Sequence, residues 1–179
     1  MLLDNYYQLR TQAGLTKSGG GFLTDLNLQV NLSDGTSYAL NYQECNGPDR
    51  LIKSDDKSYV KTLIPPATDT TGGNKYIVFG DGNNPVETDN YSISGSPIAN
   101  ISISSVEGIR TVTGFKIMYT FKYTGTNTAT IKEVCIFDNF TSYLSNNSRK
   151  VALWREVFQT PLQVPAGSIF TYNFEVAFN

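Results

Sequence analysis

The alternation of hydrophobic and polar residues is clearest between residues 111 and 137. From residue 115 to 123, every second position is aromatic or branched apolar: Phe115, Ile117, Tyr119, Phe121 and Tyr123. A period of two residues is typical of a strand with one buried and one wetter face. A polar loop at 124–128, which contains Gly and Asn, separates this run from a second one rich in β-branched residues at 129–137. The pattern predicts a long β-hairpin at the centre of an antiparallel sheet.

Two other segments carry the same period. Residues 22–32 alternate as a half-buried strand, Asp34-Gly35 is a hairpin turn signal, and the returning strand places three residues on its core side, Tyr38, Leu40 and Tyr42. The last predicted strand, 169–178, buries Phe170, Tyr172, Phe174, Val176 and Phe178. Before it, Val164-Pro165-Ala166-Gly167 fits a β-turn with Pro at the second position.

Shorter apolar runs lie between these segments. They predict strands at 59–64 and 76–79, one or two short strands within 98–106, and a strand at 151–158 around Trp154. Proline cannot donate a backbone hydrogen bond to a sheet, so we expect Thr160-Pro161 to end the last of these. Residues 43–57 and 138–150 are polar and predict loops.

The spacing of these runs predicts an all-β protein with little helix. Strands recur between turn signals and no long helical period appears, which favours an antiparallel β-sandwich. The pattern leaves a jelly-roll and an immunoglobulin-like strand order open. We expect a single β-sandwich domain at 22–179 after an N-terminal arm or extension at 1–21, which ends in Ser18-Gly19-Gly20-Gly21. That segment reads either as an arm on a neighbouring subunit or as a loose terminus.

Composition narrows the range of partners and compartments. The formal net charge is −2, and no basic block is present, so nucleic-acid binding is not expected. The first ten residues lack a secretory signal pattern, and no apolar run is long enough to predict a membrane span. We therefore expect a protein that stays in the cytoplasm or joins an assembly there. Cys45 and Cys135 then read as reduced, buried thiols, with a disulfide as the alternative.

The residue types present limit the candidate chemistry. The chain has no histidine, which disfavours a Ser-His-Asp nucleophile and a zinc site. Two acidic pairs are candidates for glycoside hydrolysis, Asp55 with Asp56 and Glu87 with Asp89, although acids in loops are ordinarily solvated. The oxygens of 80–84 are a candidate calcium site but lack the full EF-hand spacing. We expect no enzyme activity, and no catalytic, cofactor-binding or metal-binding residues.

Aromatic side chains raise a second class of function. Outward-facing rings in a row would form a platform for sugars, and the candidates are Tyr6, Tyr7, Tyr42, Tyr59, Tyr91 and Tyr143. Most other Tyr and Phe residues fall at strand positions that read as core. The alternative function is thus a carbohydrate-binding β-sandwich module for recognition of a host surface.

Three segments, in order, carry a resemblance to a known group of proteins. The first is residues 76–85, a strand followed by Gly80-Asp81-Gly82-Asn83-Asn84-Pro85, and then Asp89-Asn90-Tyr91. The second is residues 115–137, with Ile131-Lys132-Glu133-Val134 in its second half. The third is residues 153–176, with Arg155-Glu156 and the 164–167 turn. This order resembles β-rich virion proteins of tailed bacteriophages, and Cys135 stands where a glycine is common in them.

The resemblance covers about residues 76–178 and implies a role without chemistry of its own. It implies a non-enzymatic structural protein of the virion, in the capsid, neck, tail or fibre, assembled in the host cytoplasm. Its partners would be other copies of itself and other virion proteins, with no nucleic acid and no membrane, and a host glycan as a further candidate. It transfers no catalytic residues and no cofactor.

Overall fold

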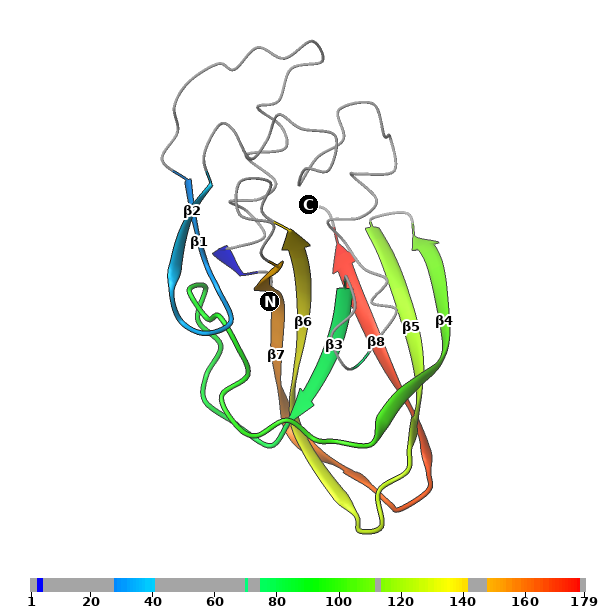
Figure 1. Ribbon diagram of the computed structural model, residues 1–179. Coiled ribbons are helices and arrows are strands. Elements are labelled where there is room, and N and C mark those ends of the chain that lie inside the picture. The colour runs from blue at the N-terminus through cyan, green and yellow to red at the C-terminus, as the bar shows by residue number, and fades with distance from the viewer. Residues whose placement is uncertain are drawn as a thin grey trace.

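The computed structural model describes residues 3–4, 28–40, 70, 75–111, 114–141 and 148–177. Over these residues the chain is all-β with almost no helix, as predicted. Its strands are β1 (Leu28–Asn31), β2 (Ser37–Leu40), β3 (Lys75–Gly80), β4 (Ile101–Thr111), β5 (Gly114–Tyr123), β6 (Ala129–Thr141), β7 (Ser148–Val164) and β8 (Ile169–Ala177). They form three antiparallel sheets with the orders β1-β2, β3-β6-β7 and β4-β5-β8 (Figure 1).

The two strands of the expected central hairpin do not pair with each other. β5 is the middle strand of one three-stranded sheet and β6 is the middle strand of the other, so the hairpin prediction is wrong. At the end of β5, the Tyr123 amide donates to Ser168 O and the Thr124 amide donates to Asn100 O. These bonds keep the end of β5 within its own sheet, while the 124–128 loop carries the chain across to the other (Figure 1).

One hydrophobic cluster is shared by the two three-stranded sheets. It takes Ile77 and Phe79 from β3, Val134 and Ile136 from β6, and the alternating residues of β5 and β8. The ring of Phe79 meets the ring of Phe121 edge-on at 4.8 Å between centroids, which joins the two sheets. The alternation of β5 is confirmed, because its buried residues are Ile117, Tyr119, Phe121 and Tyr123. Burial of these large side chains is the main favourable term in the folding of such a core.

β7 continues through the proline that was expected to end it. Between the pairs Ile131↔Leu162 and Glu133↔Val157, β6 has only Lys132, while β7 has the residues from Phe158 to Pro161. This irregularity takes Pro161 out of the regular ladder, where its missing N–H has no cost. The prediction of a strand break there is wrong for this reason.

The loop expected at 138–150 is also shorter than predicted. Pairing of Asp138 with Val151 continues to Thr141 with Ser148, so β6 and β7 extend into both of its ends. The hydrogen bonds of a strand are made by the backbone and do not depend on side-chain polarity. Polar residues can therefore form strands, and polarity alone did not identify a loop here.

The outer face of the β3-β6-β7 sheet is covered as well. A second cluster lies on it, made of Leu3, Tyr76, Cys135, Phe137 and Ala152, with Val78, Val86 and Ile93 packed against it. Val86 and Ile93 belong to the segment between β3 and β4. The Leu3 amide donates to Leu153 O at 3.0 Å, and the Asp4 amide donates to Thr88 O at 2.7 Å, so both residues dock on their own chain. The rest of the proposed arm at 1–21 lies outside the described residues.

The β1-β2 hairpin forms as its turn signal predicts. Gly35 has a φ of +83°, a conformation that glycine adopts without steric cost. The hydroxyl of Thr36 donates to Asp34 Oδ1, which lowers the pKa of Asp34 below its ordinary value. Leu32 bridges to Val151 at the edge of β7. The predicted strand residues 22–27, Tyr42 and the strand at 59–64 lie outside the described residues.

The remaining strand predictions hold with one change of detail. β3 and β8 form where expected. In place of one or two short strands within 98–106, β4 is one strand that continues to Thr111, with an irregularity near Ile103. In the turn before β8, the Ser168 amide donates to Pro165 O and Gly167 has a φ of +73°, so Pro165 takes the first position of the turn instead of the second. Within the described residues, no helix is long and apolar enough to cross a membrane.

Candidate functional site

A buried ion pair lies on the outer face of the β3-β6-β7 sheet. Glu133 of β6 is 0% exposed and Arg155 of β7 is 1% exposed. Arg155 Nη2 lies 2.8 Å from Glu133 Oε2, and Arg155 Nε donates to the same oxygen at 2.9 Å. They are the buried charged side chains of the described part of the chain. A charge out of water is costly unless it is paired and hydrogen-bonded, so the remaining polar atoms of both groups need partners.

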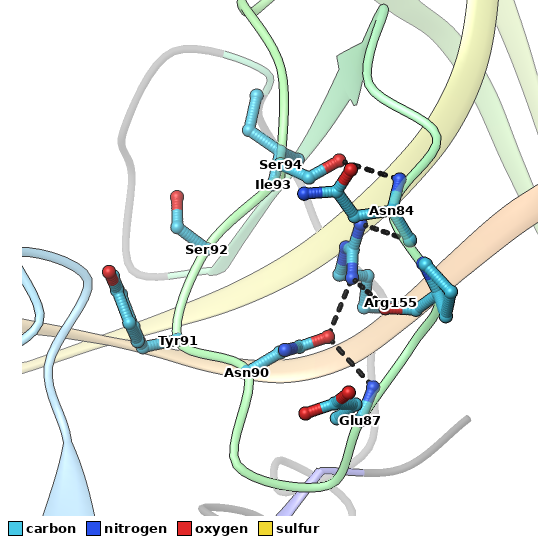
Figure 2. Close-up of a pocket in the computed structure, with 9 residues that line it drawn as sticks. Asn84, Glu87, Asn90, Tyr91, Ser92, Ile93, Ser94 and Arg155 are labelled. Carbon is cyan, nitrogen blue, oxygen red and sulfur yellow. Dashed lines mark hydrogen bonds between the residues drawn. The ribbon is translucent and has the colours of Figure 1, made fainter.

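The other contacts of Arg155 reach into the segment after β3. Its Nη2 donates to Asn84 O at 2.9 Å, and its Nη1 donates to Pro85 O at 3.1 Å and to Asn90 Oδ1 at 2.6 Å (Figure 2). Asn90 Oδ1 also accepts from the Glu87 amide. One guanidinium therefore fixes both ends of the turn from Asn84 to Asn90.

Glu133 fixes the next part of the same segment. Its Oε1 accepts hydrogen bonds from the Ser94 amide at 2.9 Å and from the Gly95 amide at 2.8 Å, and the Ser94 hydroxyl donates at 3.1 Å. Burial would raise the pKa of Glu133, but the hydrogen bonds from Ser94, Arg155 and Gly95 outweigh it, and the pKa lies below its ordinary value of 4.5. The carboxylate is therefore charged at neutral pH.

Two glycines let the segment approach this carboxylate. A Cβ atom on Gly82 would collide with Glu133 Oε1, the Ser94 hydroxyl and the Gly95 amide, and a Cβ atom on Gly95 would collide with the backbone of Gly82. Asp81 closes the same turn, because its Oδ1 accepts from the Ser96 amide at 2.7 Å. We call residues 80–96 together with Glu133 and Arg155 the clip.

The clip joins pieces of all three segments that carry the virion-protein resemblance. Gly80, Gly82 and Pro85 come from the first, Glu133 from the second and Arg155 from the third. The order of these residues along the chain does not by itself show that they meet in space. A usable signal was present, since Glu133 and Arg155 each stand within an otherwise largely apolar run, where a charge calls for a buried partner.

A pocket of about 510 Å³ opens within the clip, lined by Asn84, Pro85, Glu87, residues 90–94 and Arg155. Of the sequence candidates, Glu87 and Tyr91 lie in its wall, and Tyr91 is 45% exposed. Asp89 does not line it; its backbone oxygen accepts from Asn31 Nδ2. The pair Asp55 and Asp56 lies outside the described residues, as do the tyrosines Tyr6, Tyr7, Tyr42, Tyr59 and Tyr143.

The described residues contain no group of three or more His, Cys, Asp or Glu side chains that could hold a metal ion. Cys135, next to the clip on β6, is buried with a free thiol, and burial raises its pKa. Cys45 lies outside the described residues.

The lowered pKa of Glu133 predicts a loss of stability in acid. Its contribution is fully present above the unfolded-state pKa, near 4.5, and is lost as the pH falls through the lower folded-state value. We expect the stability difference between the wild type and Glu133→Gln to be largest at neutral pH and to shrink below pH 4.5. Urea denaturation of both proteins at several pH values measures this. A difference that does not change with pH would contradict it.

Searches of protein-family models, of curated proteins and of solved structures returned no match to this chain.

Proposed function

We propose that this chain is a non-enzymatic structural protein of a bacteriophage virion, a β-sandwich module that works through homo-oligomeric and partner-protein interfaces. The observation that carries the proposal is the convergence of the three resemblance segments on the clip. If these residues matched the virion-protein pattern only because each forms a common local turn, they would not be expected to contact one another in the fold. Here Gly82, Glu133 and Arg155 come together across the fold and depend on one another sterically and electrostatically.

The use of the two buried charges supports a structural role. A catalytic carboxylate has to reach a substrate, whereas Glu133 is fully buried and its oxygens accept from Ser94, Gly95 and Arg155. The guanidinium nitrogens of Arg155 likewise donate their hydrogen bonds to Glu133 and to the segment after β3. Such a network makes a loop rigid, which suits a building block whose surfaces must keep their shape in an assembly.

The outer edge of β4 is the surface that best fits an interface. No described strand pairs with this edge of β4. At its first residue, the Ile101 carbonyl accepts a hydrogen bond from the Thr70 hydroxyl at 2.7 Å. Val106 and Ile109 on this strand are 38% and 42% exposed. An unpaired strand edge with apolar side chains tends to pair with another chain, and an assembly would bury it.

Particle composition tests the proposal. If the proposal holds, peptides of this chain will be found by mass spectrometry in virions purified by density gradient from cells infected with the phage that encodes it, in a fixed ratio to the major virion proteins. Their absence from purified particles, with the protein present in the lysate, would contradict it.

Light scattering on the recombinant protein measures the mass of the oligomer. Ile109→Lys is expected to lower this mass, because it places a charge at the β4 edge, and Thr126→Lys in the exposed 124–128 loop is the control.

A further inference from the structure

We propose that the pocket within the clip binds a neutral sugar residue of a glycan. This goes beyond the structural role and does not depend on it. The pocket volume, about 510 Å³, falls within the range of roughly 300–1,000 Å³ common for small-molecule sites. Apart from Arg155, its wall comes from one stretch of chain, 84–94, that Arg155 and Glu133 hold in place. A site that is already rigid loses little conformational entropy when a ligand binds.

The charges of the pocket argue against an anionic ligand. Arg155 is the cationic side chain of its lining, and each of its guanidinium nitrogens already donates within the chain, to Glu133, to Asn90 or to backbone carbonyls. Its charge is matched by Glu133 at 2.8 Å. The other charged lining residue is Glu87, an exposed carboxylate. A phosphate or sialic acid would therefore meet a negative charge without a free cation to offset it.

The polar groups that remain suit hydroxyls. Asn90 Oδ1 accepts from Arg155 and from the Glu87 amide, which turns its Nδ2 donors away from both, as Figure 2 shows. The Glu87 carboxylate is an acceptor on the same turn, and Ser92 adds a hydroxyl to the wall. Paired donors and acceptors of this kind match the vicinal hydroxyls of a sugar, each of which both donates and accepts.

Tyr91 supplies the apolar part of the site. Its ring rests against Gly35 of the β1-β2 turn, where an added Cβ would lie 3.3 Å from Cζ, and the side chain is nevertheless 45% exposed. A tyrosine that is braced on one side and open on the other is a surface on which the C–H face of a sugar ring can pack. The β1-β2 hairpin thus supports the aromatic ring, and the ion pair of the clip positions the polar groups.

Saturation-transfer NMR on the full chain tests the proposal. The probes are methyl α-glucoside, methyl β-galactoside, methyl α-mannoside and N-acetylglucosamine, with sialic acid and glucose 6-phosphate as anionic comparisons. We expect transfer to at least one neutral probe and none to the anionic ones. Tyr91→Ala should weaken binding roughly tenfold through loss of stacking. Tyr91→Phe should retain most of it, and Glu87→Gln should weaken it.

Matched variants distinguish this site from general surface effects. Ile169→Ala removes another exposed apolar side chain, and Glu107→Gln removes another exposed carboxylate, and both should bind like the wild type. Circular dichroism confirms that each variant is folded. No transfer to any neutral probe, binding that Tyr91→Ala leaves unchanged, or preferential binding of the anionic probes would each overturn the proposal. None of these outcomes bears on whether the protein is part of a virion, which particle composition decides.

Discussion

Replacing Arg155 with methionine is expected to lower the free energy of unfolding by about 3–5 kcal/mol, since it leaves a buried carboxylate without its partner. Methionine keeps an unbranched apolar stem, so the loss comes chiefly from the guanidinium. Glu133, which is 0% exposed, would lose its cationic partner, and the carbonyls of Asn84 and Pro85 would lose their donor. Urea denaturation followed by the fluorescence of Trp154, the adjacent residue on β7, measures the change.

An exposed ion pair provides the matched control. Lys116 on β5 lies 3.1 Å from Glu175 on β8, with 30% and 63% of the two side chains exposed. Lys116→Met also removes the cation of an ion pair, but exposed pairs contribute only about 0–1 kcal/mol to the free energy of unfolding, so a small loss is expected. If Arg155→Met costs no more than Lys116→Met, the buried pair does not hold the clip together.

Replacing Glu133 as well as Arg155 measures the interaction energy between the two side chains. In the double variant Glu133→Gln with Arg155→Met, no uncompensated charge remains, so the combined loss should be smaller than the sum of the single losses by about 1–3 kcal/mol. Strict additivity would mean that each side chain is stabilised by the 80–96 segment independently of the other.

Gly82→Ala is expected to lower the free energy of unfolding by about 1–3 kcal/mol, because the added methyl group overpacks the clip. The new Cβ would meet Glu133 Oε1, the Ser94 hydroxyl and the Gly95 amide. All three groups are linked by hydrogen bonds, since the hydroxyl and the amide both donate to that oxygen, so none of them can move without disturbing a hydrogen bond. We expect thermal unfolding to show the loss. The exchange of the Ser94 and Gly95 amides with solvent deuterium should also become faster, because their bonds to Glu133 are disturbed.

Gly108 on β4 is the control position for the Gly82→Ala substitution. A Cβ there would meet no atom within 4 Å, and the residue has no positive φ. Gly108→Ala should therefore leave stability unchanged or raise it by up to about 1 kcal/mol, since alanine restricts the unfolded chain. Equal losses for Gly82→Ala and Gly108→Ala would show that the close packing of the clip contributes nothing to stability.

Local patterns in the sequence determined the class of structure and the faces of its strands. The two-residue period of β5 and β8 identified buried residues such as Tyr119 and Phe174, and Asp34-Gly35 identified a hairpin turn. These features depend on a few neighbouring residues: side chains of a strand alternate whatever it pairs with, and a positive φ favours glycine in any fold. Glu87 and Tyr91 were candidates by residue type alone, one as an acid paired with Asp89 and the other as an aromatic that could face outward.

Only the tertiary structure decided which strands pair and where the charged residues meet. A buried face on β5 and another on β6 are compatible both with a hairpin and with strands in two separate sheets. The structure places them in separate sheets, and the amides of residues 123 and 124 donate to Ser168 and Asn100 instead of to β6. Pro161 stays in β7 because β6 leaves an irregularity opposite it. Glu133 and Arg155 form the clip with a segment that the sequence places far from both. Their partners are set by long-range packing, which the period of a single strand does not encode.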